Sequence, residues 1–299
     1  AAAPPHSPPP GPPMLHLLPA LVLPYPQIDP VLVEIGPVAI RWYAVAYIAG
    51  ILLGWWYAVR LIRKSSLWTS WGGTPPMSAE QTDDFILWAT LGIILGGRIG
   101  YILFYGFIYE PEIYANPMAW LEIWKGGMSF HGGLIGVILA VILFSIVKRL
   151  DMVRVGDIVA SVTPIGLFTG RIANFINGEL WGKPSDAPWA MVFPTGGPLP
   201  RHPSQLYEAA LEGILLFLIL RVLATRFKAF DRPGLIIAAF LFFYGLFRII
   251  AEIFRDSDQL VGGGIISMGQ LLSAIMFVGA AFFAWWAATH RARPSQGPA

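Results

Sequence analysis

The chain has 299 residues, of which 56% are hydrophobic and only 13% are charged, and its formal net charge is +2. A soluble domain carries about 25% charged residues, so this composition excludes an ordinary water-soluble protein and indicates one surrounded by lipid. Twelve tryptophans and ten tyrosines are typical of a protein that meets two membrane–water interfaces. The chain contains no cysteine, which excludes a disulfide, a cysteine nucleophile and a thiolate metal site.

The chain begins with a Pro-rich, low-complexity stretch, residues 1–13, whose composition cannot form a packed element. We expect residues 1–20 to be a disordered N-terminal segment. Residues 21–290 are expected to form one seven-helix transmembrane domain, and residues 291–299 a cytoplasmic tail.

Seven segments are long and apolar enough to cross a membrane, because a spanning helix needs about 20 mainly apolar residues. The predicted fold class is therefore all-α: a polytopic integral membrane protein with about seven transmembrane helices. Six or eight helices remain alternatives, since the fourth and fifth segments contain Gly, Asn and Glu. The seven segments are 37–59, 83–107, 128–148, 156–176, 206–226, 235–255 and 266–289.

The basic residues of the connections predict the orientation, because Lys and Arg concentrate on the cytoplasmic side. One set of connections holds Arg60, Arg63, Lys64, Lys148, Arg149, Arg154, Arg221, Arg226, Lys228, Arg232, Arg291 and Arg293. The opposite set holds only Lys125, Lys183, Arg201 and Arg255. This asymmetry predicts that the N-terminus is outside and the C-terminus is cytoplasmic, which requires an odd number of helices.

The remaining basic residues lie inside the predicted spans, where an arginine costs about 2.5–3.5 kcal/mol on insertion scales. They are Arg41, Arg98, Arg171 and Arg248. At 1.5 Å per residue, Arg171, Arg248 and Arg98 lie roughly 8, 10 and 13 Å from the outer ends of their helices. His131 and Tyr43 also lie near outer helix ends. These groups come from five helices, and they predict a polar site in the outer half of the membrane.

The segment Gly170–Gly182 closes the fourth predicted helix and enters an outer loop. Arg171 and Asn174 share a helix face, and a guanidinium beside an amide suits a phosphate, to which Arg offers a bidentate fork. Alternatively, Arg171 forms an ion pair with Glu179 that ties the loop to the helix. Gly182 permits a tight turn or a close backbone approach.

A polar stripe of Tyr244, Arg248 and Glu252 follows one face of the sixth predicted helix at intervals of four residues. Arg248 and Glu252 form an i,i+4 pair that lowers the cost of burial. The functional interpretation makes Arg248 a second phosphate ligand, oriented by Glu252, with Tyr244 facing the reacting atoms. The two interpretations are compatible.

His131 stands at the start of the third predicted helix, in the segment Met128–Gly133. Its unperturbed pKa of about 6.5 suits a proton acceptor, so it is either a general base or a hydrogen-bond partner. Arg98 lies among glycines, a pattern that favours close helix packing or charge balance for a lipid headgroup. His202 lies in Arg201–Glu208, which predicts either a helix cap at Ser204 or a substrate contact.

The sequence lacks the motifs of several other classes of enzyme. The sequence has no G-x-S-x-G elbow, no H-E-x-x-H zinc pair and no P-loop. We therefore expect no metal, no other cofactor and no nucleic-acid partner. The rival interpretations are a transporter for an anionic solute, which would use the same arginines, and an intramembrane protease, for which no nucleophile is evident.

The chain from about Ile35 to Trp286 resembles the bacterial prolipoprotein diacylglyceryl transferases. The longest matching motif, GRIANFINGELWG at 170–182, is specific enough to carry the resemblance alone. The other matching segments are IGPVAIRWY (35–43), GGRIGY (96–101), MSFHGGLIG (128–136), RHPSQLYEA (201–209) and YGLFRIIAEIFR (244–255).

The resemblance implies a seven-helix enzyme of the bacterial inner membrane, with its N-terminus in the periplasm and its site toward the outer leaflet. It implies transfer of a diacylglyceryl group from phosphatidylglycerol to the lipobox cysteine thiol of a preprolipoprotein, with release of glycerol 1-phosphate. The residues expected to be catalytic are His131, Arg171, Tyr244, Arg248 and Glu252. Those expected to bind substrate are Tyr43, Arg98, Asn174, Glu179, Gly182 and His202.

Overall fold

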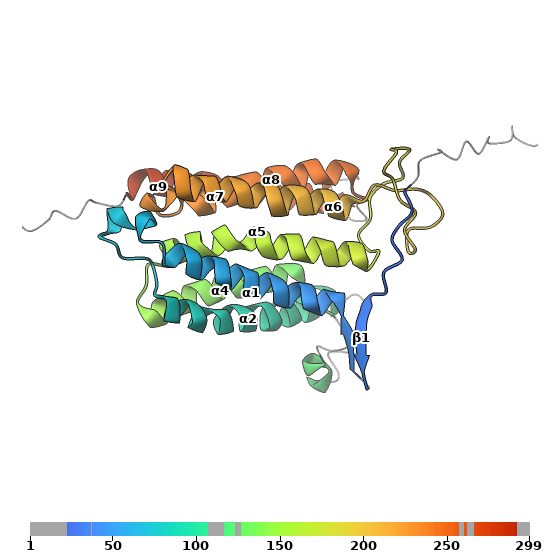
Figure 1. Ribbon diagram of the computed structural model, residues 1–299, viewed down its shortest axis with the longest axis horizontal. Coiled ribbons are helices and arrows are strands. Elements are labelled where there is room, and N and C mark those ends of the chain that lie inside the picture. The colour runs from blue at the N-terminus through green and yellow to red at the C-terminus, as the bar shows by residue number, and fades with distance from the viewer. Residues whose placement is uncertain are drawn as a thin grey trace, which may run out of the picture.

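The computed structural model describes residues 23–36, 38–106, 117–122, 127–256, 260–261 and 266–291. The predicted disordered segment, residues 1–20, and all but the first residue of the predicted tail lie outside these ranges. Long helices run side by side in one elongated bundle (Figure 1). One end of the bundle carries strand β1 and helix α6, and we call it the hairpin end. The connection after α1, light blue in Figure 1, lies at the opposite end.

In the part of the chain that the structure describes, the bundle consists of six long helices and one composite helix. The long helices are α1 (Trp42–Ile62), α2 (Ala79–Tyr101), α4 (Phe130–Lys148), α5 (Met152–Ile176), α8 (Leu235–Phe254) and α9 (Met268–Thr289). The composite helix consists of α6 (Ser204–Glu208), the π-helical η7 (Ala209–Leu215) and α7 (Leu216–Arg226). The shorter helical segments are η1 (Ser65–Leu67), η2 (Thr69–Trp71), η3 (Ile102–Gly106), η5 (Pro117–Leu121) and η8 (Ala229–Asp231).

Five of these helices are long and apolar enough to cross a membrane: α1, α4, α5, α8 and Gly269–Thr289 of α9. Helix α2 begins with Glu80, Asp83 and Asp84 and also contains Arg98, whereas α7 alone has only 11 residues. The protein is therefore a largely helical membrane protein, as its composition predicts. The number of spans and the sides of the two termini stay predictions.

Within the described ranges, two short antiparallel hairpins depart from the predicted all-α fold. Strands β1 (Val31–Ile35) and β2 (Val38–Arg41) pair around Gly36, whose φ is 60°. The first predicted helix, 37–59, therefore starts too early, because Val38 to Arg41 extend the β-branched pattern of the preceding strand. A second hairpin joins β3 (Leu260–Val261) to β4 (Ile266–Ser267). Consequently Tyr43 is the second residue of α1 and not deep within it.

Asp157 of α5 serves the N-terminus of another helix. Helix α5 begins five residues earlier, and its cap is Asp151, which accepts hydrogen bonds from the backbone N–H groups of Val153 and Arg154. Buried Asp157 instead accepts from the backbone N–H groups of Gly234 (2.7 Å) and Ile237 (3.0 Å). It thereby satisfies amides at the start of α8 that have no partner within the helix.

The apolar core fills the half of the bundle away from the hairpin end. Its largest fully buried side chains include Trp68, Phe144, Ile158 and Leu220. Toward the hairpin end the interior becomes polar, with Gln205, Glu208 and Glu212 among the fully buried side chains. The buried polar side chains are therefore concentrated at the hairpin end of the bundle.

Helices α2 and α4 cross in close contact along their glycines. A Cβ on Gly100 would lie 2.6 Å from the Cα of Gly132, and one on Gly132 would lie 2.8 Å from the Cα of Gly100. Small residues let helix backbones approach in this way. This crossing confirms the close-packing interpretation of the glycines around Arg98.

The substitution Gly132→Ala is expected to destabilise the protein by about 1–3 kcal/mol, because the added methyl group overpacks a backbone contact. The neighbouring Gly133→Ala is the matched control, since its Cβ would meet only the carbonyl oxygen of Ile93 at 3.7 Å. Thermal unfolding in detergent compares the two variants. An equal change in their Tm would contradict the contact as the cause.

Candidate functional site

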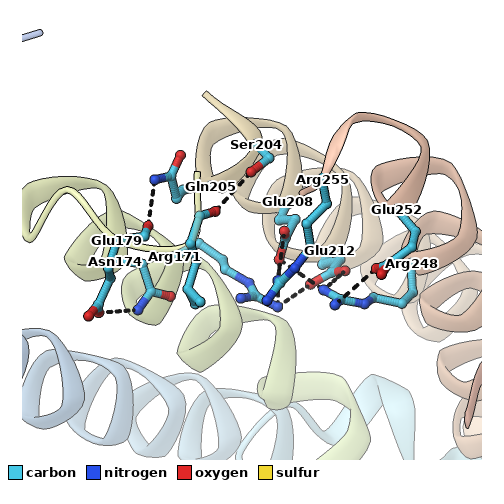
Figure 2. A network of polar contacts seen from close by, with 11 residues as sticks. Arg171, Asn174, Glu179, Ser204, Gln205, Glu208, Glu212, Arg248, Glu252 and Arg255 are labelled. Carbon is cyan, nitrogen blue, oxygen red and sulfur yellow. Dashed lines mark hydrogen bonds and ion pairs between the residues drawn. The ribbon is translucent and has the colours of Figure 1, made fainter. Parts of the chain in front are cut away.

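Six charged side chains meet at the hairpin end of the bundle, and we call them the arginine–glutamate network (Figure 2). They are Arg171 of α5, Glu208 of α6, Glu212 of η7, Arg248 and Glu252 of α8, and Arg255 directly after α8. Glu208 lies at the centre. Its Oε2 is 2.6 Å from Nη2 of Arg171 and 3.0 Å from Nη1 of Arg248, and its Oε1 is 3.3 Å from Nη1 of Arg255.

The remaining carboxylates extend this network on both sides. Glu212 lies 3.3 Å from Nη2 of Arg171 and 3.7 Å from Nη1 of Arg248. Glu252 lies 3.1 Å from Nη2 of Arg248, which confirms the predicted i,i+4 pair. A π-helical turn, a feature often found at functional sites, carries Glu212 within the composite helix. The spacing of four residues still leaves Glu208 and Glu212 facing the same two arginines.

Burial divides the network into a floor and a rim. The side chains of Glu208 and Glu212 are 1% and 0% exposed, whereas those of Arg171 and Arg248 are 16% and 15% exposed. Each guanidinium has five N–H donors, and the glutamates take donors on the buried side. The partly exposed arginines therefore form a cationic rim over a carboxylate floor.

A second group of hydrogen bonds lies beside the network, as Figure 2 shows. The Asn174 amide donates to Oε1 of Glu179 (2.7 Å), and the Gln205 amide donates to the backbone oxygen of Glu179 (2.6 Å). The alternative pairing of Arg171 with Glu179 is wrong, because Arg171 pairs with Glu208 and Glu212. These bonds fix the loop after α5 against the start of α6.

Ser204 is the first residue of α6 and makes no capping hydrogen bond. Its hydroxyl donates to the backbone oxygen of Leu180 (2.9 Å). The predicted helix cap at Ser204 is therefore wrong, and the motif that contains it ties α6 to the same loop.

Two tyrosines interact with the arginines, and a third packs against one of them. Tyr244 of α8 interacts electrostatically with Arg171, Arg248 and Glu212. Tyr47 of α1 interacts electrostatically with Arg171, and the Tyr43 ring lies against the Tyr47 ring, tilted by 41°, with centroids 5.1 Å apart. Tyr47 and Tyr244 therefore interact with the same arginine from α1 and α8, and Tyr43 lies beside Tyr47.

Close packing around Gly182 leaves no space for a larger side chain. Its N–H donates to the backbone oxygen of His202 (2.8 Å), and a Cβ there would lie 2.8 Å from the Cβ of His202 and closer still to the backbone oxygen of Phe254. His202 meets the Tyr207 hydroxyl at 3.0 Å. Partial burial lowers the pKa of His202 below its ordinary value, so the ring is neutral at pH 7. Both residues join the loop after α5 to the end of α8.

The other two predicted site residues come from α2 and α4, helices that contribute no side chain to the network. Arg98 is buried, and it donates to the backbone oxygens of Trp120 (3.0 Å) and Gly127 (3.1 Å). These bonds support its structural interpretation. His131 is the second residue of α4 and lies edge-on to Phe130 at 5.6 Å. Among the described residues, His131 forms no hydrogen bond with Arg171 or Arg248.

Sequence reasoning missed four residues of this region: Tyr47, Glu208, Glu212 and Arg255. The signal for the two glutamates is their position inside an apolar segment, where an ionisable residue predicts a function by default. The sequence analysis counts Arg255 only among the basic residues of the connections, yet its side chain is 18% exposed and pairs with Glu208. Within the described ranges, no group of three or more His, Asp or Glu side chains is arranged to hold a metal ion.

The chain is similar to known proteins over most of its length. A family model described as prolipoprotein diacylglyceryl transferase matches residues 30–286. A protein of Allorhizobium ampelinum named phosphatidylglycerol–prolipoprotein diacylglyceryl transferase is 56% identical over 93% of this chain and 95% of its own length. Proteins with the same name are 57% identical in Rhodopseudomonas palustris, over 87% and 90% of the two chains, and 58% identical in Rhodospirillum rubrum, over 86% and 91%.

Proposed function

The chain belongs to the prolipoprotein diacylglyceryl transferase family, and we propose that it transfers the diacylglyceryl group of phosphatidylglycerol to the lipobox cysteine thiol of preprolipoproteins. Glycerol 1-phosphate leaves, and a thioether forms. The names of its relatives contain both substrate classes. The arginine–glutamate network is the proposed place of the reaction.

The observation that carries this proposal is the convergence of two guanidiniums on one oxygen atom. Arg171 and Arg248 come from different helices, and both contact Oε2 of Glu208. Their side chains stay partly exposed on the rim. Arginine binds phosphate oxygens through planar, bidentate hydrogen bonds, so the rim can hold the phosphodiester of the lipid headgroup.

The chemistry explains why cations are needed there. The thiol has an ordinary pKa of about 8.5, and only its thiolate is a good nucleophile. In the proposed reaction the sulfur attacks an sp³ carbon of the diacylglycerol part, a C–S bond forms, and the C–O bond to the phosphate breaks. The bonding electrons pass to the phosphate, which leaves as a monoester, while the thiol proton passes to a base. Arg171 and Arg248 would stabilise the charge that develops on the phosphate.

The base is proposed to be His131 or Tyr244. Tyr244 interacts with both arginines, so it is well placed to face the reacting atoms. His131 lies at the start of α4, and as a histidine it can accept a proton near neutral pH. Glu252 would orient Arg248, to which it is paired. Asn174, Glu179 and Gly182 would shape the loop that faces the substrate.

The substitution His131→Ala is expected to abolish lipidation of the thiol if this histidine is the base, because general-base catalysis contributes about 10²–10⁴-fold. The measurement is turnover against pH in reconstituted membranes. A base contributes an acidic limb to the pH profile, and the variant should lose that limb. Wild-type turnover and an unchanged profile would leave Tyr244 as the proposed base.

We further propose seven spans in the bacterial inner membrane, with the hairpin end toward the outer leaflet and the periplasm. The asymmetry of the basic connections supports this orientation. Helix α2 and the composite helix α6–η7–α7 supply the two spans beyond the five apolar helices. A translocated lipobox segment could then meet phosphatidylglycerol at the arginine–glutamate network.

One assay tests the proposed activity directly. The purified protein is incubated with phosphatidylglycerol and a lipobox peptide, and the products are analysed by mass spectrometry. We expect release of glycerol phosphate together with a peptide heavier by one diacylglyceryl group. A variant peptide with Ser in place of Cys is the control. If neither product appears, and the protein instead carries an anionic solute across vesicle membranes, the protein is a transporter.

A further inference from the structure

A cavity of about 520 Å³ opens between the last turns of α1 and the end of α7. In Figure 1 the end of α1 lies at the opposite end of the bundle from α6, which carries Glu208 of the arginine–glutamate network. Four cations line the cavity: Arg60, Arg63 and Lys64 from the end of α1, and Arg221 from α7. No Asp or Glu is among the lining residues. Two segments that are far apart in the sequence thus bring positive charge to one cavity.

Two other described cations at the same end have partners outside the cavity. Lys148 pairs with Asp84 at 2.7 Å, and Arg154 lies 3.9 Å above the Trp71 ring and donates to the backbone oxygen of Thr74. No ion pair between the four lining cations and a described carboxylate is formed. Exposed Glu80 interacts electrostatically with Arg63 from outside the cavity.

Aromatic side chains of the cavity wall lie next to two of the arginines. Tyr57 interacts electrostatically with Arg221, and the buried Tyr57 ring packs against Phe217 with centroids 4.9 Å apart. The Arg60 guanidinium lies 5.5 Å from the centre of the Trp56 ring. Because less side-chain freedom is lost on binding, an anion meets partly preorganised donors here.

The mouth of the cavity continues into an apolar surface. Leu52, Leu53 and Trp56 of α1 are each at least half exposed, and Leu218 and Val222 of α7 are 48% and 45% exposed. The cavity volume lies within the usual range for ligand sites, about 300–1,000 Å³. A ligand with an anionic head and apolar chains matches this combination of a cationic cavity and an apolar border.

We propose that this cavity binds a phosphate group, supplied by the headgroup of an anionic phospholipid in the leaflet at this end of the bundle. Basic pockets between membrane helices bind such headgroups. The site is separate from the arginine–glutamate network, so the proposal does not rest on the proposed function. The alternative is that the cations only set the orientation of the protein, for which any position at this end is equivalent.

The test compares two double variants of the full-length protein that remove the same charge. Arg63→Gln with Arg221→Gln changes the cavity. Arg149→Gln with Arg232→Gln changes exposed positions at the same end that do not line it. Each protein is titrated in neutral detergent with short-chain phosphatidylglycerol, with phosphatidylcholine of the same chains, and with inorganic phosphate. Native mass spectrometry counts the bound lipids, and calorimetry follows phosphate.

We expect the cavity variant to retain one phosphatidylglycerol fewer than the wild type and the control, through an affinity loss of about thirtyfold for two surface cations. Its turnover of a lipobox peptide should equal that of the control. Equal lipid retention in both variants, or equal retention of phosphatidylcholine and phosphatidylglycerol, would overturn the proposal. A third outcome separates the two sources of phosphate. If only the cavity variant loses saturable binding of inorganic phosphate, while all three proteins retain equal amounts of lipid, the cavity binds free phosphate and the proposal of a lipid headgroup is overturned.

Discussion

The substitution Arg171→Ala is expected to lower kcat/KM for diacylglyceryl transfer by about 10²–10³-fold, the usual effect of removing one donor to a developing anion. Arg171 is one of two guanidiniums that contact Oε2 of Glu208, and its partly exposed side chain belongs to the rim that would face the phosphate. Turnover is measured with purified protein in mixed micelles that contain phosphatidylglycerol.

The same substitution also breaks buried ion pairs, which destabilises a protein by about 3–5 kcal/mol. A second variant separates the two effects. Arg171→Gln combined with Glu212→Gln removes both members of the pair at 3.3 Å, so it leaves no surplus charge from that pair. We expect this double variant to regain much of the lost Tm but not the activity. Recovery of activity would mean that Arg171 serves only to balance charge.

The positions of the helices and of the arginines follow largely from the sequence. An apolar segment of about 20 residues is a strong signal in lipid, and each of the seven predicted segments overlaps one long helix or the composite helix. Arg171, Arg248 and Glu252 were predicted because a charge in an apolar segment is costly and needs a reason. The i,i+4 pair of Arg248 and Glu252 follows from helix geometry alone.

The partners between helices could not be predicted in the same way. Glu208 and Glu212 lie 37 and 41 residues after Arg171, and only the packing of α5 against the composite helix brings them together. Local reasoning therefore offered Glu179, which is close in sequence, as the partner of Arg171. Asp157 illustrates the same limit, since it caps α8 across the bundle and not its own helix.

Charge balance makes the arginine–glutamate network a constraint on the mechanism. Arg171, Arg248 and Arg255 face Glu208, Glu212 and Glu252, so the network is neutral when all six are ionised. An arriving phosphodiester adds one negative charge to a region of low dielectric, where uncompensated charge is costly. The carboxylate floor must then serve mainly to hold the arginines, and the central carboxylate of Glu208 should matter most.

The substitution Glu208→Ala is therefore expected to lower kcat by about a hundredfold, because a displacement of about 1 Å can cost that much. Three arginines lose their shared acceptor, while the network gains a positive charge. KM for phosphatidylglycerol should then stay constant or fall. Steady-state kinetics over a range of lipid concentrations distinguishes this result from loss of a lipid ligand, which would raise KM.

Glu208→Gln should have a smaller effect than Glu208→Ala for a geometric reason. The glutamine oxygen can replace Oε2 and keep Arg171 and Arg248, whereas its amide group then faces Arg255, which loses the acceptor at 3.3 Å. Asp186→Asn, at an exposed position in the loop after α5, is a control that should retain wild-type kinetics. If both variants at position 208 raised KM and left kcat unchanged, Glu208 would not position the arginines. A partial recovery of kcat in Glu208→Gln, at an unchanged KM, is the result that assigns the carboxylate floor to holding the two guanidiniums in their reactive arrangement.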